Sequence, residues 1–184
     1  MLNILVVYVE NKPGVLSRVI SLFRRRNFNI DSLTVGRTEK PDVSRMTIVV
    51  EGDADQVRRI VANVYKLVNV LLVDDITGKP SLVRDLALIK VNATQATRSQ
   101  VLDIAQIFKA RVLDLATESI TMEMTGGEEK VDRLLEILTP FGLLEVVRTG
   151  AVAMRRGAKS AVPAIEGPRP AAAKAHDDNV SYSV

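Results

Sequence analysis

The chain has 184 residues, of which 47% are hydrophobic and 26% are charged, and its formal net charge is +3 at pH 7. This length provides enough burial for one domain or for two small ones. The absence of cysteine excludes disulfides and thiolate chemistry and fits a reducing compartment. Neither a signal peptide nor a run of about 18 apolar residues occurs, so we expect a cytoplasmic protein without a membrane span.

The first half of the chain predicts the order βαββαβ, which is typical of a ferredoxin-like sandwich. Apolar residues at helical spacing indicate one helix at Gly14–Arg26 and a second one capped by Asp53 or Asp55. Runs rich in β-branched residues predict the strands, which are Asn3–Val9, Phe28–Gly36, Ser44–Glu51 and Val70–Ile76. We therefore expect a first domain at residues 1–78.

The second half repeats this pattern and predicts a second, similar domain at residues 84–157. Helices are expected at Arg98–Lys109 and Glu128–Leu138. The expected strands are Arg84–Val91, Arg111–Leu115, Ser119–Thr125 and Leu143–Met154. Alanine, proline, lysine and glycine dominate residues 158–184, a composition that predicts a disordered tail. The fold class is thus α+β, with two tandem sandwiches and a tail.

The stretch Glu10–Val19, between the first strand and the first helix, is the most informative in the sequence. Pro13 at the helix start loses no hydrogen bond, and Gly14 lacks the Cβ that would keep a ligand off the backbone. We expect the N–H groups of Gly14, Val15 and Leu16 to point outward at the positive end of the helix dipole. Such a helix start binds a small carboxylate, which predicts an amino-acid receptor. From spacing alone, Gly14 is equally well explained as a turn residue without a ligand.

No combination of residues predicts catalysis or a metal site. His176 is the only histidine and lies in the predicted tail, which argues against a histidine-based triad or metal site. The carboxylate pairs at 74–75 and 128–129 are adjacent rather than convergent, so we assign them to solvation or helix capping. Gly126-Gly127 lacks the lysine and serine of a P-loop. Arg24–Arg26 is expected to be a solvated helix end.

Several segments, in order and at matching spacing, resemble one known family: Asn11–Arg18, Asn29–Val35, Ser44–Ile48, Leu86–Val91 and Val147–Gly150. The family is the regulatory (small) subunit of acetolactate synthase, also called acetohydroxyacid synthase. The resemblance spans residues 1–157 and implies that the first domain is an ACT domain, the small-molecule-sensing version of the sandwich. It also implies that the chain has no catalytic site of its own.

The resemblance further implies a homodimer through the ACT domains, with a branched-chain amino acid bound between two protomers. The effector carboxylate would contact the turn at Gly14, and the amide of Asn11 would fix the ligand's polar end. Asn29 of the neighbouring protomer would bond the ligand, and Ile30 would touch its isopropyl group. The alternative for Asn29 is an ordinary left-handed turn residue. The expected effector-binding residues are Asn11, Gly14, Val15, Leu16, Asn29 and Ile30.

The partner implied by the resemblance is the catalytic large subunit, which carries thiamine diphosphate, Mg²⁺ and FAD; we expect none of these on this chain. The small subunit would activate that enzyme and confer feedback inhibition. Valine is the favoured effector. The sequence does not separate it from leucine or isoleucine, because one methylene changes binding by only about 1–3 kcal/mol.

Two other functions fit parts of the sequence. A free-standing ACT-domain sensor could regulate a different enzyme or transcription. RNA binding is the third hypothesis, because the RNA-recognition motif has the same element order and stacks bases on aromatic residues of its central strands. Here Tyr8 is the only aromatic residue on those two strands, so we expect no nucleic-acid partner.

Overall fold

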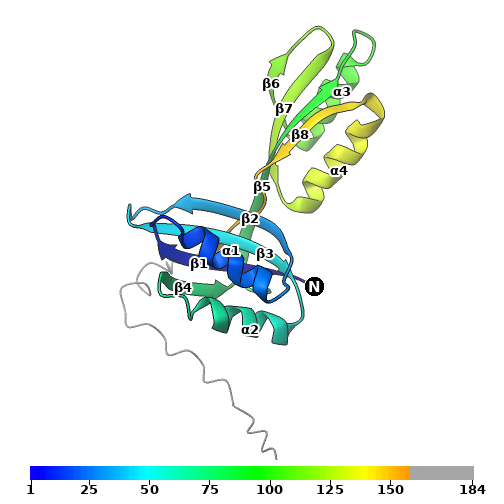
Figure 1. The fold of residues 1–184 in the computed structure, drawn as a ribbon. Coiled ribbons are helices and arrows are strands. Elements are labelled where there is room, and N and C mark those ends of the chain that lie inside the picture. The colour runs from blue at the N-terminus through cyan, green and yellow to red at the C-terminus, as the bar shows by residue number, and fades with distance from the viewer. Residues whose placement is uncertain (158–184) are drawn as a thin grey trace, which may run out of the picture.

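The computed structural model describes residues 1–157, so the predicted tail lies outside the described residues. Figure 1 shows two lobes connected end to end by one long strand, β5 (Ser81–Asn92). Each lobe has the order βαββαβ, and one more strand follows the second. The α+β class and the tandem sandwiches are therefore confirmed. No helix among the described residues is long and apolar enough to cross a membrane.

The first lobe is a four-stranded antiparallel sheet with two helices on one face. Its strands lie in the order β2-β3-β1-β4, and each neighbouring pair is antiparallel. Its core is formed by alternate residues of the central strands, such as Leu5, Val7 and Ile48, against Val19 and Phe23 of the first helix. The elements are β1 (Leu2–Glu10), α1 (Val15–Arg25), β2 (Ile30–Arg37), β3 (Val43–Glu51), α2 (Ala54–Val64) and β4 (Val70–Asp75).

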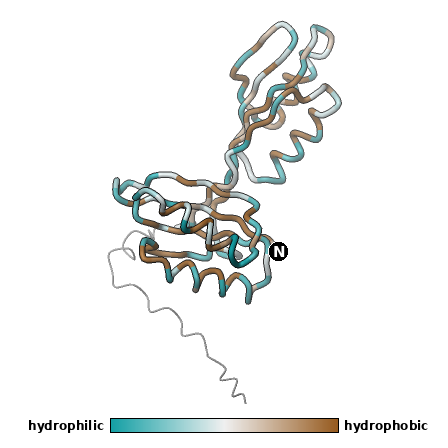
Figure 2. The backbone as a smooth tube through the Cα atoms, in the orientation of Figure 1, coloured by the Kyte–Doolittle hydropathy of each residue, from teal (hydrophilic) through white to brown (hydrophobic). Residues whose placement is uncertain are grey.

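The second lobe repeats this arrangement with different residues. Its order β6-β7-β5-β8 is the same permutation of strands, and its helices cover one face over a core that includes Ile89, Met122 and Leu134. Figure 2 shows apolar residues along the strands and alternating with polar ones on the helices. Besides β5, the elements are α3 (Arg98–Phe108), β6 (Arg111–Leu115), β7 (Ser119–Gly126), α4 (Glu128–Leu138), a 3₁₀ turn (Thr139–Phe141) and β8 (Leu143–Arg148).

The last predicted strand, Leu143–Met154, is in fact two strands. β8 ends at Arg148, and β9 (Val152–Arg155) follows a turn in which Gly150 has φ +82°. β9 pairs with the first residues of β5, and this two-stranded ribbon packs against the face of the first sheet that the helices leave free. Ala153 is buried there. The two lobes are thus connected through both ends of the second domain.

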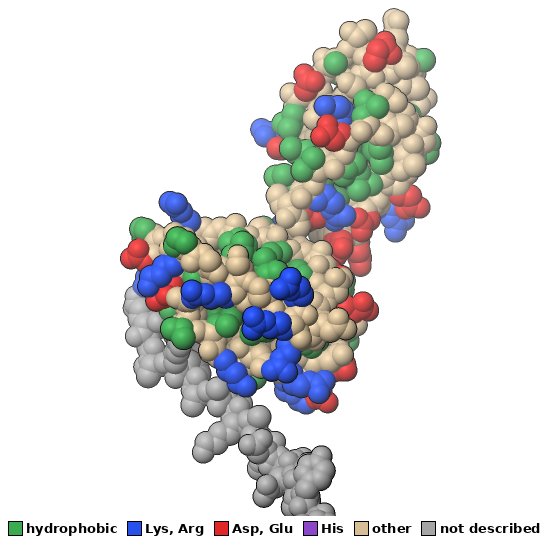
Figure 3. Space-filling model, in the orientation of Figure 1, with side chains coloured by type: hydrophobic (Ala, Val, Ile, Leu, Met, Phe, Trp, Pro, Cys, Tyr) green, Lys and Arg blue, Asp and Glu red, His purple; other side chains and the backbone are tan. Residues whose placement is uncertain are grey.

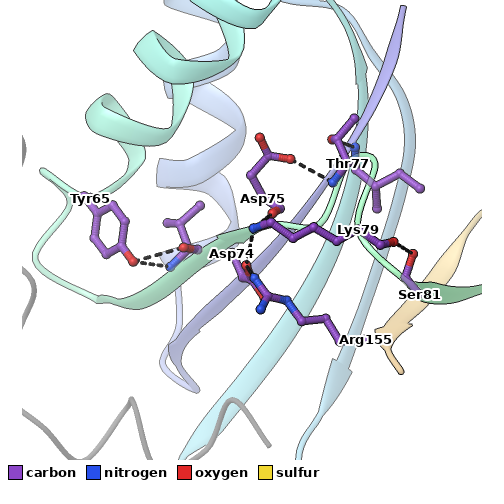
Figure 4. A network of polar contacts seen from close by, with 9 residues as sticks. Tyr65, Asp74, Asp75, Thr77, Lys79, Ser81 and Arg155 are labelled. Atoms are coloured by element: carbon purple, nitrogen blue, oxygen red, sulfur yellow. Dashed lines mark hydrogen bonds and ion pairs between the residues drawn. The ribbon is translucent and has the colours of Figure 1, made fainter. Parts of the chain in front are cut away.

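Polar contacts hold the turn between the lobes (Figure 4). Thr77 donates its N–H to the Asp75 carboxylate at 3.0 Å, and Ser81 donates its hydroxyl to the Lys79 carbonyl at 3.0 Å. The carboxylate of Asp74 on β4 forms ion pairs with Lys79 and with Arg155 of β9. The ion pair with Arg155 fastens the end of the ribbon to the first lobe.

Candidate effector site

The turn between β1 and α1 places Gly14 directly before a helix that begins at Val15, one residue later than the sequence predicts. Gly14 is the residue before the helix and has φ +79°, a left-handed conformation that L residues with a side chain rarely adopt. A Cβ added there would meet no atom within 4 Å, so the space outside the turn is open. No acidic residue stands in the first turn of α1, and no side chain caps it. The positive end of the α1 dipole therefore has no acidic side chain in its own first turn to neutralise it.

Two of the three predicted N–H groups are free. The N–H groups of Gly14 and Leu16 have no acceptor within residues 1–157, while that of Val15 donates to the carbonyl of Lys12 over 3.4 Å. The Val15 side chain is buried and fixes the start of α1 on the core. Helix starts leave such N–H groups unpaired, and a bound carboxylate can accept from them.

The amide of Asn11 is engaged within the chain rather than directed at open space. It donates to the carbonyl of Pro41 at 2.9 Å and accepts from the hydroxyl of Ser44 at 3.1 Å. The backbone N–H of Asn11 donates to the carbonyl of Asp42 at 2.7 Å. Asn11 thus ties the Gly14 turn to the loop between β2 and β3. In this arrangement it shapes the turn.

Asn29 and Ile30 lie at the opposite end of α1 from Gly14. The helix has 11 residues, and at about 1.5 Å per residue its ends are separated by about 16 Å. Asn29 is exposed and donates to the carboxylate of Asp31 at 3.1 Å, while Ile30 packs partly against the core. The left-handed turn residue is Asn27, with φ +57°, and not Asn29. One chain therefore does not bring the two predicted halves of the site together.

An apolar patch lies on the outer side of α1 and on β2. Leu16 and Ile20 are among the apolar residues at helical spacing that predict α1, yet they are 37% and 38% exposed. Val35 on β2 is 41% exposed. β2 is also an edge strand, so one side of its backbone has no partner strand within the described chain. Exposed apolar side chains beside a free sheet edge are typical of a surface that another chain covers.

A second polar cluster joins the two lobes near β2. Ser32 accepts the N–H of Ala151 at 2.8 Å, and Thr34 donates its hydroxyl to the carbonyl of Thr149 at 3.3 Å. Gly150 lies between these partners, and a Cβ added there would fall 2.4 Å from the Ser32 hydroxyl oxygen. The strand that begins at Ile30 therefore contacts the second domain through Ser32 and Thr34, two and four residues later.

Behind this contact, Arg148 bridges two carboxylates in the second domain. It donates to buried Asp85 at 2.7 Å and to Asp132 at 2.7 Å, and Thr149 also donates to Asp85. Partial burial acts to lower the pKa of Arg148, but the hydrogen bonds and charges of both carboxylates outweigh it and raise that pKa. Arg148 stays charged and holds the end of β8 in place.

The surface that RNA binding would require is covered. Tyr8 is only 8% exposed, and the Arg45 guanidinium lies 5.7 Å from the centre of its ring. Arg45 also donates to the carbonyl of Ala153 on β9, so the ribbon lies over this face of the sheet. A base could not stack on Tyr8 in this fold, which removes the reason for considering RNA.

Comparison with known proteins agrees with the fold and decides the family. Residues 5–72 match the AHAS small subunit-like ACT domain, and residues 84–157 match the small subunit of acetolactate synthase. A probable acetolactate synthase small subunit from Archaeoglobus fulgidus is 47% identical over 159 residues, covering 86% of this chain and 99% of that one. The chain belongs to the acetolactate synthase small-subunit family.

Two further relatives extend this result. The acetolactate synthase small subunit of Mycobacterium leprae is 48% identical over 151 residues, or 82% of this chain and 89% of that one. A crystal structure of the small subunit from Thermotoga maritima is 35% identical, has a TM-score of 0.81, and covers 86% of this chain and 99% of that one. The chain is thus a regulatory small subunit with an N-terminal ACT domain.

The sequence did not identify the residues at the junction of the two domains. Ser32 and Gly150 are separated by more than a hundred positions, and no local pattern relates them. A usable signal was Thr149-Gly150, because glycine after an apolar strand indicates a turn with positive φ. Among residues 1–157, no three metal-ligating side chains of the usual kinds converge.

Proposed function

We propose that this chain activates the catalytic large subunit of acetolactate synthase and inhibits it when a branched-chain amino acid, valine in the first place, binds to its ACT domain. The observation that supports this most directly is the Gly14 turn, with two free N–H groups, open space and no competing carboxylate at a helix start. Together these features suit the carboxylate of an amino acid.

The complete site in this proposal is shared by two copies of the chain. Asn29 and Ile30 are too far from Gly14 of their own chain to touch the same small ligand. A two-fold axis beside β2 and across the middle of α1 would set the two α1 helices antiparallel, with the Gly14 turn of one against the Asn29 end of the other. In the same arrangement, the second chain would cover Leu16, Ile20 and Val35, and the free β2 edges of the two chains would pair.

The energies also favour a shared site. Binding at a dissociation constant of about 1 mM requires about 4.1 kcal/mol. A helix start contributes about 0.3–1 kcal/mol, or about 2 kcal/mol when partly buried. Burial of a valine side chain contributes about 1.5–3 kcal/mol. Neither the helix start nor the buried side chain supplies this free energy alone. The two together reach it when Asn29 and Ile30 of a second chain bury the ligand against the Gly14 turn.

Regulation then requires the ligand to favour one arrangement of the assembly over another. A ligand that bridges two protomers does this, because it binds only when the two ACT domains are correctly paired. β2 carries the signal in this proposal, since it begins at the site with Ile30 and contacts the second domain through Ser32 and Thr34.

The test is to titrate valine into the purified full-length chain by calorimetry and to assay the cognate large subunit with and without this chain. We expect heat of binding at up to millimolar valine, activation without valine and inhibition with it. Leucine and isoleucine in parallel titrations determine the preferred effector. Absence of binding together with an activity that valine leaves unchanged would falsify the proposal.

A further inference from the structure

A basic hollow lies between α1 and α2 on the outer surface of the ACT domain. Its volume is about 420 Å³, and its polar lining consists mainly of Ser17, Arg18, Ser21, Arg25, Arg26 and Lys66. Figure 3 shows Lys and Arg side chains gathered over these helices, with few acidic ones among them. The hollow is within the size range of small-molecule sites, which is about 300–1,000 Å³.

This hollow is separate from the surface assigned to the second chain. An α-helix turns by about 100° per residue, so Ser17, Ser21 and Arg25 lie on a different side of α1 from Leu16 and Ile20. The apolar patch faces outward beside β2, whereas the hollow opens toward α2. A second copy that covers the patch would therefore leave the hollow accessible.

The positive charge in the hollow has little negative charge near it. No carboxylate lines the hollow, and none forms an ion pair with Arg25, Arg26 or Lys66 in the part of the chain that the structure describes. The Glu10 carboxylate lies beyond Asn69, whose side-chain amide links it to Arg18. The sequence explains this in part, because residues 11–30 contain five basic residues and no acidic one. By contrast, Arg58 on the outer side of α2 pairs with Asp55.

Helix dipoles account for only some of these cations. The C-terminal ends of α1 and α2 stabilise Arg25, Arg26 and Lys66. Arg18 stands in the first turn of α1, where the dipole is positive and a cation is disfavoured. Bringing it into one hollow with three other cations adds like-charge repulsion. All four side chains are exposed, so water and salt screen this repulsion, and an anion bound among them would relieve what is left of it.

Neutral groups orient two of the guanidiniums without cancelling their charge. Arg18 donates to the amide oxygen of Asn69 at 2.5 Å, and Arg26 donates to that of Asn63 at 3.3 Å. Each guanidinium keeps further N–H groups for a ligand. The hydroxyls of Ser17 and Ser21 lie one helical turn apart and have no hydrogen-bond partner in the described part of the chain.

We propose that this hollow binds a compact anion with two or more negative charges, of the diphosphate class. Planar guanidiniums match phosphate oxygens with paired hydrogen bonds, and serine hydroxyls and a lysine ammonium complete a set of donors. Leu22 and Leu67 are the only apolar residues in the lining, and no aromatic residue is present to stack on a nucleobase. The charged group itself is therefore the ligand, bound between α1 and α2.

Calorimetric titration of inorganic pyrophosphate into the full-length chain, in about 0.15 M salt to screen loose surface binding, tests this site. We expect saturable binding that the double variant Arg25→Ala, Lys66→Ala weakens at least tenfold. The matched control is Arg58→Ala, Arg59→Ala, which removes the same charge from the surface of α2 outside the hollow. The control is expected to bind pyrophosphate as the original chain does. Circular dichroism verifies that both variants remain folded.

Three results would overturn the proposal. The first is no heat of binding at millimolar pyrophosphate, and the second is an equal loss of affinity in the two double variants. The third is monophosphate binding as tightly as pyrophosphate, since a site for several charges distinguishes them. If pyrophosphate does not bind but the Arg25→Ala, Lys66→Ala variant alone loses affinity for the large subunit, the hollow is a docking surface for an acidic protein instead. The titration requires no valine, so its outcome is independent of the effector site.

Discussion

Gly14 allows charge and backbone conformation to be varied separately. Aspartate and asparagine have nearly the same size, and both tolerate positive φ better than other residues with a side chain. Both side chains would project into the open space in front of the turn. Only aspartate places a negative charge where the effector carboxylate is expected to bind.

We therefore predict that Gly14→Asp abolishes inhibition by valine while activation of the large subunit remains. Gly14→Asn should raise the half-inhibitory valine concentration by much less, with a gap of at least about tenfold between the two variants, or about 1.4 kcal/mol. Inhibition curves with the same large subunit provide the measurement. If both variants were inhibited like the original chain, the carboxylate would bind elsewhere.

Asn11 lies beside the Gly14 turn, but its side chain makes contacts that the sequence does not indicate. The sequence indicates that it stands at the Gly14 turn, and the structure places it there. Its partners are Pro41 in the loop before β3 and Ser44 in β3, 30 or more positions away, and no local pattern relates them to Asn11. Contacts of this kind depend on strand pairing, here between β1 and β3, and so become visible only in the folded chain.

At the scale of single elements, helix α2 begins with a reciprocal cap. The Asp53 carboxylate accepts the N–H of Gln56 at 2.8 Å, and the Gln56 side chain accepts the N–H of Asp53 at 2.8 Å. Both bonds are local, which is why the sequence could identify Asp53 as one of two candidate caps. The structure selects it over Asp55, which pairs with Arg58.

We predict that Asp53→Ala lowers the free energy of unfolding by about 1 kcal/mol, within the range of about 0.5–2 kcal/mol for a lost cap. Asp53→Asn should lower it by much less, since asparagine caps helices about as well. Chemical denaturation of both variants measures the difference. A stability equal to that of the original chain for Asp53→Ala would show that the cap contributes nothing.

Elements with local signals were predictable, and those that depend on a distant partner were not. α4 has the predicted bounds because its apolar residues repeat at helical spacing and glycine precedes it. The division of the last strand at Gly150 was missed because both halves are apolar and extended. Only the pairing of β9 with β5, under the first sheet, separates them. The sequence does not predict the exposure of Leu16 and Ile20 for a related reason. The spacing of apolar residues shows which of them share one side of a helix, but not what packs against that side.

At the scale of the whole assembly, a site shared by two chains makes a prediction that a site within one chain does not. In a Gly14→Asp chain, the turn that would bind the effector carboxylate is blocked. An Asn29→Ala chain cannot supply the Asn29 amide to the site of its neighbour. The Asn29→Ala homodimer should bind valine more weakly by about 1–3 kcal/mol, the usual cost of an unpaired polar group. In a mixed dimer, one site carries both defects and the other carries neither.

We predict that mixed dimers, co-expressed with two different tags and purified through both, recover one site per dimer with the original affinity. Calorimetry gives both the stoichiometry and the dissociation constant. Homodimers of each variant, purified in the same way, are the controls. A mixed dimer that binds valine only as weakly as its parents would place the entire site within one chain.

The junction between the two domains gives the last prediction. Gly150 has φ +82°, and an added Cβ would lie 2.4 Å from the Ser32 hydroxyl oxygen. Gly78 offers a matched control, because its φ is +67° and an added Cβ would meet nothing within 4 Å. Both alanine variants bear the strain of positive φ, about 1–2 kcal/mol. Only Gly150→Ala should also break the hydrogen bond from Ala151 to Ser32.

Hydrogen exchange distinguishes these two effects. We expect the Ala151 amide to lose protection in Gly150→Ala and to keep it in Gly78→Ala, since exchange reports the local opening of each hydrogen bond. Under the proposed function, Gly150→Ala should bind valine normally yet inhibit the large subunit less, because β2 no longer contacts the second domain through Ser32. Equal protection of Ala151 in the two variants would mean that the junction adjusts around the added methyl group and does not hold the domains together.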